Sequence, residues 1–184
     1  AWNGYQYWER SQATKAAAFF DEVERAVASS DLVRVERSLA DMKDKFGGTQ
    51  FAQQAALLAA KSLQAQGKSD AAREALNWVA SSASDKAYRD LARLRLASLQ
   101  LDAKAYDEAL KLLGEEFTPP MLGLVADLKG DVLLAKGQNA EAVAAYQTAW
   151  QKLAETPDYR RLVQAKLNAL GIDPDQALVT EAKK

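Results

Sequence analysis

Small residues recur at two matching places in three consecutive segments of the chain. Ala60, Ala97 and Gly130 open these segments at spacings of 37 and then 33 residues, and each is followed twelve residues later by an alanine. Between the two small residues lies a short turn, flanked by stretches whose apolar residues recur at helical spacing. Each segment is therefore predicted to form two antiparallel helices that cross where small side chains let the backbones approach. The second small residues are Ala72, Ala109 and Ala142.

This period brackets the roughly 34 residues of the tetratricopeptide repeat, whose hairpins stack side by side into a solenoid. The predicted fold is an all-α, tetratricopeptide-like right-handed α-solenoid of antiparallel helix pairs, in a single domain over residues 1–184. An N-terminal helix pair spans residues 1–48, three hairpins span 49–154, and C-terminal capping helices span 155–184. Few Gly and Pro and plentiful Ala and Leu agree with an all-α chain.

Local signals set the expected helix ends. Asp31 is expected to cap a helix over residues 32–46, and Gly47 with Gly48 to end that helix as a left-handed C-terminal cap. Asp85 and Asn139 are predicted to cap two later helices.

Two segments that contain proline mark the starts of further helices. Thr118-Pro119-Pro120 and Thr156-Pro157-Asp158 place proline at an early helical position, where its missing N–H costs nothing. A closing helix over residues 159–170 then carries one apolar stripe, to which Lys166 contributes its aliphatic stem.

The composition excludes several classes of function. The 24 basic and 25 acidic residues are interspersed, so no cationic stripe indicates a nucleic-acid partner. The chain has no cysteine, which excludes disulfides and Cys-type zinc sites, and no histidine, which excludes a Ser-His-Asp mechanism. An enzyme built from this chain would have to work with carboxylates and lysines. We predict that the protein is not an enzyme, with no catalytic residues, no cofactor and no metal site.

The first helix of each hairpin is expected to line the inner wall of the solenoid, forming a protein-binding groove of mixed polarity. The alternative is that these side chains only face water or neighbouring helices. The candidate groove residues are Gln54, Leu57, Lys61, Leu91, Leu94, Ser98, Leu124, Asp127 and Asp131.

Asp127 and Asp131 also stand four residues apart on one helix face, as a general-acid pair or a hard-metal site would. Acidic pairs at this spacing are routine on soluble helices, so a solvated face is the favoured interpretation. The loop Phe117-Thr118-Pro119-Pro120-Met121 has two interpretations as well. It is an exposed contact or, preferably, a plug between hairpins.

Large aromatic residues crowd the beginning of the chain, which starts at Ala1 without an initiator methionine. Trp and Tyr gather at membrane–water interfaces, so the segment is interpreted as the stub of a removed membrane span. The alternative is that these rings pack on the second helix. The residues are Trp2, Tyr5, Tyr7 and Trp8.

Three segments together resemble the YfgM-type proteins of Gram-negative bacteria. They are the aromatic opening over residues 2–10, the segment 125–137 with its Ala-Asp-Leu-Lys-Gly-Asp start, and the ending over 163–170. The likeness runs in order along nearly the whole chain. The resemblance implies a single-pass inner-membrane protein whose membrane helix precedes this chain and whose tetratricopeptide-like domain lies in the periplasm.

The same resemblance implies an ancillary Sec translocon subunit that assists chaperone handling of exported proteins. The implied partners are the Sec translocon, a periplasmic membrane-anchored chaperone and exported client polypeptides. No binding motif carries over residue by residue, so the groove prediction depends on repeat geometry alone. A generic tetratricopeptide scaffold or adaptor without a membrane link is the alternative.

Overall fold

The computed structural model describes residues 2–175 of the chain, and the side chains of residues 10–175. It divides into two compact units, Ala1–Arg93 and Leu94–Lys184, which are described separately. Helix α5 (Lys86–Asp102) runs through this boundary. Within the described residues every regular element is helical, which confirms the all-α prediction.

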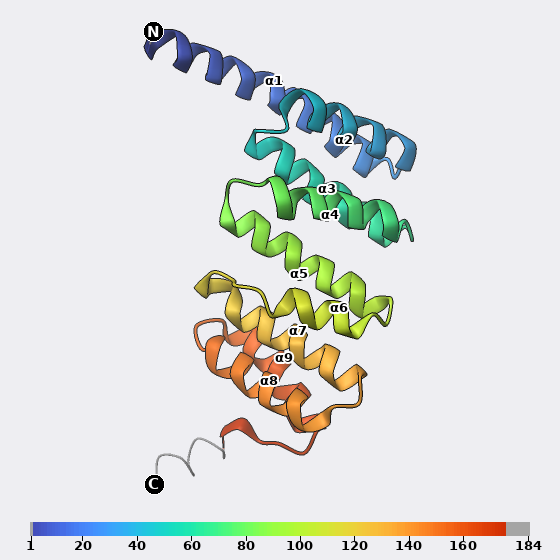
Figure 1. Ribbon diagram of the computed structural model, residues 1–184, viewed down its shortest axis with the longest axis vertical. Helices are drawn as coiled ribbons and strands as arrows, with labels where there is room; N and C mark the ends of the chain where they lie inside the picture. Colours follow the sequence, from blue (N-terminus) through green and yellow to red (C-terminus); the bar gives the residue numbers. More distant parts are fainter. Residues whose placement is uncertain (1, 176–184) are drawn as a thin grey trace. The chain divides into compact units, whose positions relative to one another are not determined.

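The first unit contains four complete helices and the beginning of α5. Helices α1 (Trp2–Ala28) and α2 (Leu32–Phe46) form one pair, and α3 (Gln50–Ala65) and α4 (Ser69–Ser82) form the next (Figure 1). Helix α1 also packs on α3. Ring contacts join these helices, with 5.0 Å between the ring centroids of Phe19 and Phe46 and 5.9 Å between those of Phe20 and Phe51.

The second unit contains the end of α5 and the helices that follow it. Helix α6 (Tyr106–Leu113) packs on α7 (Leu122–Ala135), which pairs with α8 (Asn139–Lys152). A short 3₁₀ helix, η1 (Pro119–Met121), precedes α7, and α9 (Pro157–Ala169) closes the unit against α8 (Figure 1).

The small residues that predicted the hairpins are all buried. Ala60, Ala97 and their partner alanines are at most 1% exposed, and Gly130 is buried as well. A Cβ atom built at Gly130 would overlap the ring of Tyr146 on α8. The expectation that only small side chains fit at these crossings is confirmed.

Most predicted helix ends agree with the structure. Helix α2 has the expected bounds, and Asp31 caps it by accepting a hydrogen bond from the backbone N–H of Arg34 at 3.1 Å. Asp85 accepts one from the N–H of Ala87 at 2.8 Å at the start of α5. Prolines occupy the first turns of η1 and α9 as predicted.

Two cap predictions were wrong. Gly47 ends α2 with a right-handed φ of −54°, because the chain continues through one more turn before α3. Among the described residues, the left-handed glycines are Gly67 and Gly137, at φ +78° and +85° in the turns inside two hairpins, and Gly171, at φ +78° after α9. Asn139 does not cap α8, because it is the first helical residue and the preceding Gln138 occupies the cap position without a side-chain bond.

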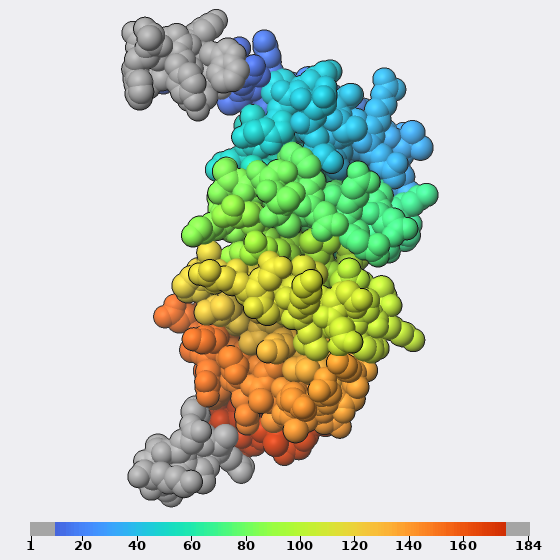
Figure 2. Space-filling model, in the orientation of Figure 1, coloured from blue at the N-terminus to red at the C-terminus, as the bar shows by residue number. Residues whose placement is uncertain are grey.

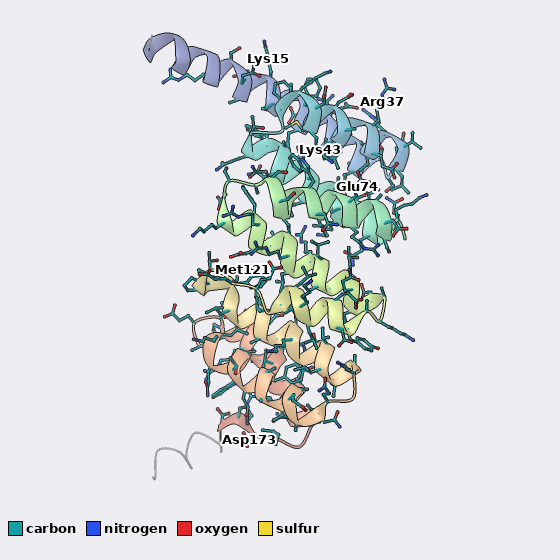
Figure 3. The ribbon with its side chains drawn as sticks, in the orientation of Figure 1. Lys15, Arg37, Lys43, Glu74, Met121 and Asp173 are labelled. Atoms are coloured by element: carbon teal, nitrogen blue, oxygen red, sulfur yellow. The ribbon has the colours of Figure 1, made fainter. Side chains whose placement is uncertain are left out.

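The loop before α7 forms the predicted plug. Phe117 is buried in an apolar cluster with Ala97, Ala109 and Val132, and Met121, labelled in Figure 3, packs against that cluster. The loop therefore fills the space between the end of α5, α6 and α7.

The aromatic opening begins α1, but the side chains of Trp2, Tyr5, Tyr7 and Trp8 lie outside the described ones, so the membrane-interface interpretation stays a prediction. The capping segment is described only as far as residue 175. Within the described residues, no helix combines the length and apolarity that crossing a bilayer requires.

Candidate functional site

The predicted groove residues of the first unit lie on α3 and α5. Leu57 is buried, and the Gln54 side-chain amide donates a hydrogen bond to the Tyr88 hydroxyl at 2.6 Å. Leu91 is half-buried, whereas Lys61 is exposed. Among the predicted groove residues of this unit, Lys61 is therefore the one that is most exposed to solvent.

The predicted groove residues of the second unit are mostly engaged within the protein. Leu94 packs against the Phe117 cluster, and Leu124 packs against the cluster that includes Tyr146. Ser98 is half-buried. Whether any of these residues contacts a ligand stays a prediction.

Asp127 and Asp131 do not form the solvated face that was predicted for them. Asp127 is 2% exposed, and the Lys166 ammonium on α9 lies between the two carboxylates. Lys166 Nζ donates to Asp127 Oδ1 at 2.8 Å and to Asp131 Oδ1 and Oδ2 at 2.7 and 2.9 Å. The prediction was wrong because α9 folds over this face of α7, which local spacing does not reveal.

Two tyrosines complete this network, which we call the α7–α9 polar cluster and which comprises Asp127, Asp131, Tyr146, Tyr159 and Lys166. The Tyr146 hydroxyl donates to Asp131 Oδ1 and the Tyr159 hydroxyl to Asp127 Oδ2, both at 2.7 Å. Tyr159 and Lys166 are seven residues apart on α9 and so point from the same helix face.

The pKa values of the donors reflect this arrangement. Burial, together with the hydrogen bond to Asp131, raises the pKa of Tyr146 above its ordinary value. Burial and the bond to Asp127 do the same to the pKa of Tyr159. Burial alone would lower the pKa of Lys166, but its hydrogen bonds to the two carboxylates outweigh this effect and the pKa is raised.

The chemistry of the polar cluster is that of a structural clamp. Its carboxylates already accept bonds from an ammonium and two hydroxyls, and no group of three or more metal-ligating side chains occurs within the described residues. Arg160 adds a second attachment by stacking over the Trp150 ring at 3.7 Å and donating to the Trp150 carbonyl at 3.1 Å. These contacts fasten α9 to α7 and α8.

Sequence reasoning missed a second feature of this unit, a groove that we call the α6–α8 groove. It has a volume of about 550 Å³ and runs over α7 between α6 and α8, two helices that both reach the viewed face in Figure 2. Its floor is apolar, with Leu122, Val125, Ala126 and Leu133 from α7, and its rim carries Lys129 and Lys152. The sequence signal for it is Gly114, which ends α6 after only 8 residues and so leaves part of α7 uncovered.

Comparison with known proteins agrees with this fold. A family model described as a tetratricopeptide repeat-like domain matches residues 1–172. The chain is 31% identical over 167 residues to a Neisseria gonorrhoeae protein named ancillary SecYEG translocon subunit, covering 90% of this chain and 80% of that protein. Proteins of the same name from Escherichia coli and Haemophilus influenzae are 28% and 25% identical, and the matches cover 92% and 91% of this chain and 82% of each relative.

The repeat pattern, the buried small residues at the helix crossings and these matches lead to one conclusion. The predicted all-α, tetratricopeptide-like solenoid is confirmed. The chain belongs to the YfgM-type family, whose tetratricopeptide repeat-like domain it carries over residues 1–172.

Proposed function

We propose that this chain is the protein-interaction domain of a membrane-anchored ancillary subunit of the Sec translocon. The observation that carries the proposal is the match over about nine-tenths of the chain to three proteins that bear that name. In the proposed arrangement the domain lies in the periplasm, held at the inner membrane by a single helix that precedes this chain. A periplasmic membrane-anchored chaperone and exported polypeptides are its further partners.

The helical hairpins suit such a role because their exposed side chains offer many weak contacts over an extended surface. Anchoring near the translocon raises the effective concentration of this surface for an emerging chain, so that weak contacts suffice. The acidic pair that an enzyme would need is occupied, because Asp127 and Asp131 share the Lys166 ammonium. We therefore propose a non-catalytic adaptor that assists chaperone handling of exported proteins.

The test is site-specific photo-crosslinking in cells that produce the full-length protein. A photoreactive amino acid replaces Lys61, the exposed member of the predicted groove on α3, and a control protein carries it at Asn77, an exposed residue of α4. We expect the Lys61 position to capture translocon subunits or exported chains more strongly than the Asn77 position does. Crosslinks to cytosolic proteins only would contradict the proposal.

The alternative is a tetratricopeptide scaffold without a membrane link. Fractionation of cells that produce the full-length protein separates the two. Recovery with the inner membrane, resistant to high salt, supports the anchored subunit, and recovery in a soluble fraction supports the scaffold.

A further inference from the structure

The α6–α8 groove has a counterpart in the first unit that is largely filled. There α2, α3 and α4 enclose a groove of about 190 Å³, against about 550 Å³ in the second unit. Lys43 of α2 and Glu74 of α4, both labelled in Figure 3, line the smaller groove. The two units thus build the same feature with different amounts of open space.

The two grooves are equivalent in the repeat alignment. Ala60 and Gly130 mark the same repeat position and are 70 residues apart in the sequence. The same offset relates the shared lining positions of the two grooves, which makes the first unit an internal reference for the second. The equivalent pairs are Lys43 and Leu113, Leu63 and Leu133, Ala71 and Glu141, Glu74 and Ala144, and Ala75 and Ala145.

Two differences open the second groove. The helix on its near side, α6, has only 8 residues, whereas α2 has 15. In addition, Trp78 in the first unit corresponds to Thr148 in the second. Trp78 lies beneath the end of α2, with Lys43 Nζ 5.3 Å from its ring centroid. With the 70-residue offset, the end of α2 corresponds to residue 116, three residues beyond the end of α6. The second unit therefore lacks both the last helical residues of the covering helix and the large ring that they cover.

We propose that the α6–α8 groove docks an amphipathic helix of a protein partner. The helix lies along the groove between the end of α6 and α8 and inserts a large apolar side chain over Thr148, where the first unit has its own Trp78. The proposed function supplies only the premise that the partner is a protein.

The charges at the rim select the kind of helix. Lys129 and Lys152 are exposed, and neither has an ion-pair partner among the described residues. Glu141 lies 11 residues before Lys152 on α8, which places it about 16 Å away along the helix axis. The groove thus fits a helix with apolar side chains at positions i, i+4 and i+7 and carboxylates beside Lys129 and Lys152.

Fluorescence anisotropy with designed peptides tests this proposal directly. The probe is a labelled helical peptide of 14 residues, the length of α8, with Leu, Trp and Leu at positions i, i+4 and i+7 and two flanking Glu residues. A second peptide replaces both Glu residues by Lys. We expect the acidic peptide to bind and the basic peptide to bind roughly tenfold more weakly or worse.

Two sets of variants locate the binding. Thr148→Trp fills the groove and is expected to weaken binding roughly tenfold or more, because central aromatic anchors dominate such interfaces. The control Gln151→Trp places the same ring on an exposed position of α8 that does not line the groove and should bind normally. Lys129→Glu with Lys152→Glu should reverse the preference toward the basic peptide.

Equal binding to Thr148→Trp and to the unaltered protein, with circular dichroism unchanged, would overturn the proposal. Equal binding of the two peptides would also overturn it. So would displacement of the labelled peptide by neutral lipid vesicles, or self-association of the protein that Thr148→Trp abolishes in sedimentation analysis. Failure here with crosslinking to the translocon intact contradicts only the groove, whereas peptide binding without such crosslinking contradicts only the proposed function.

Discussion

Replacing Lys166 by methionine tests whether the α7–α9 polar cluster holds the last helix in place. The change keeps an unbranched apolar stem and removes the ammonium group, together with its three hydrogen bonds to Asp127 and Asp131. The two carboxylates then face each other without a cation, and Asp127 is only 2% exposed. The variant is therefore expected to unfold more easily than the unaltered protein.

The structure sets the size of the effect. Removing one partner of a buried ion pair costs about 3–5 kcal/mol in the free energy of unfolding. The Lys166 side chain is 24% exposed and that of Asp131 32%, so water relieves part of the repulsion. We expect a loss at the lower end of that range, about 3 kcal/mol.

Urea unfolding followed by far-ultraviolet circular dichroism measures this loss at neutral pH. Lys111→Met is the control, since Lys111 is an exposed lysine of α6 outside the polar cluster, and it should change the free energy by less than about 0.5 kcal/mol. If both variants fall within that margin of the unaltered protein, the reasoning about the polar cluster is refuted.

The same variant alters the response to alkali. The pKa values of Lys166, Tyr146 and Tyr159 are raised by folding, so the folded protein keeps these protons to higher pH than the unfolded chain does. Their contribution to stability is complete below about pH 10 and decreases as pH rises further. In Lys166→Met the free energy of unfolding should decrease less steeply with pH above about 10, because only the two tyrosines still contribute. A decrease as steep as that of the unaltered protein would contradict this view.

Three further predictions concern single positions elsewhere. Gly130→Ala should lower the free energy of unfolding by about 1–3 kcal/mol, because the new methyl group overlaps the Tyr146 ring, whereas Gly48→Ala, with open space around it, should be nearly neutral in the same urea assay. Gln53→Met should raise the thermal midpoint, since Gln53 is 1% exposed and its Oε1 has no hydrogen-bond partner, and removing that group stabilises by about 1 kcal/mol; a lower midpoint would contradict this. Asp31→Ala removes the cap of α2 and should cost about 1 kcal/mol, and no change in the urea midpoint would argue against the cap.

Much of the fold could be predicted from the sequence because its signals are local. Capping by Asp31 and Asp85 involves residues within one turn, so these helix starts are readable directly. The prediction for Gly47 was wrong because a glycine after a helix is compatible with a C-terminal cap of either hand. Its φ of −54° depends on how the chain joins α3.

The candidate site was harder to predict because its contacts are distant in sequence. Lys166 bonds to carboxylates 35 and 39 residues away, and in the sequence it stands inside an apolar stripe with no sign of its partners. Even so, a lysine within an apolar stripe and an acidic pair in the same unit together indicate a buried ion pair. Only the position of α9 over α7 joins them.

By itself, the amino-acid sequence determined that this chain folds into helical hairpins, because the apolar period and the buried small residues specify each pair over some 35 residues. Tertiary structure decided which faces remain available to partners. Asp127 was predicted to line a groove, but it is buried because α9 covers it. The α6–α8 groove is open because α6 ends at Leu113. The physical reason is that exposure depends on what packs against a helix, whereas helix formation depends on residues a few positions apart.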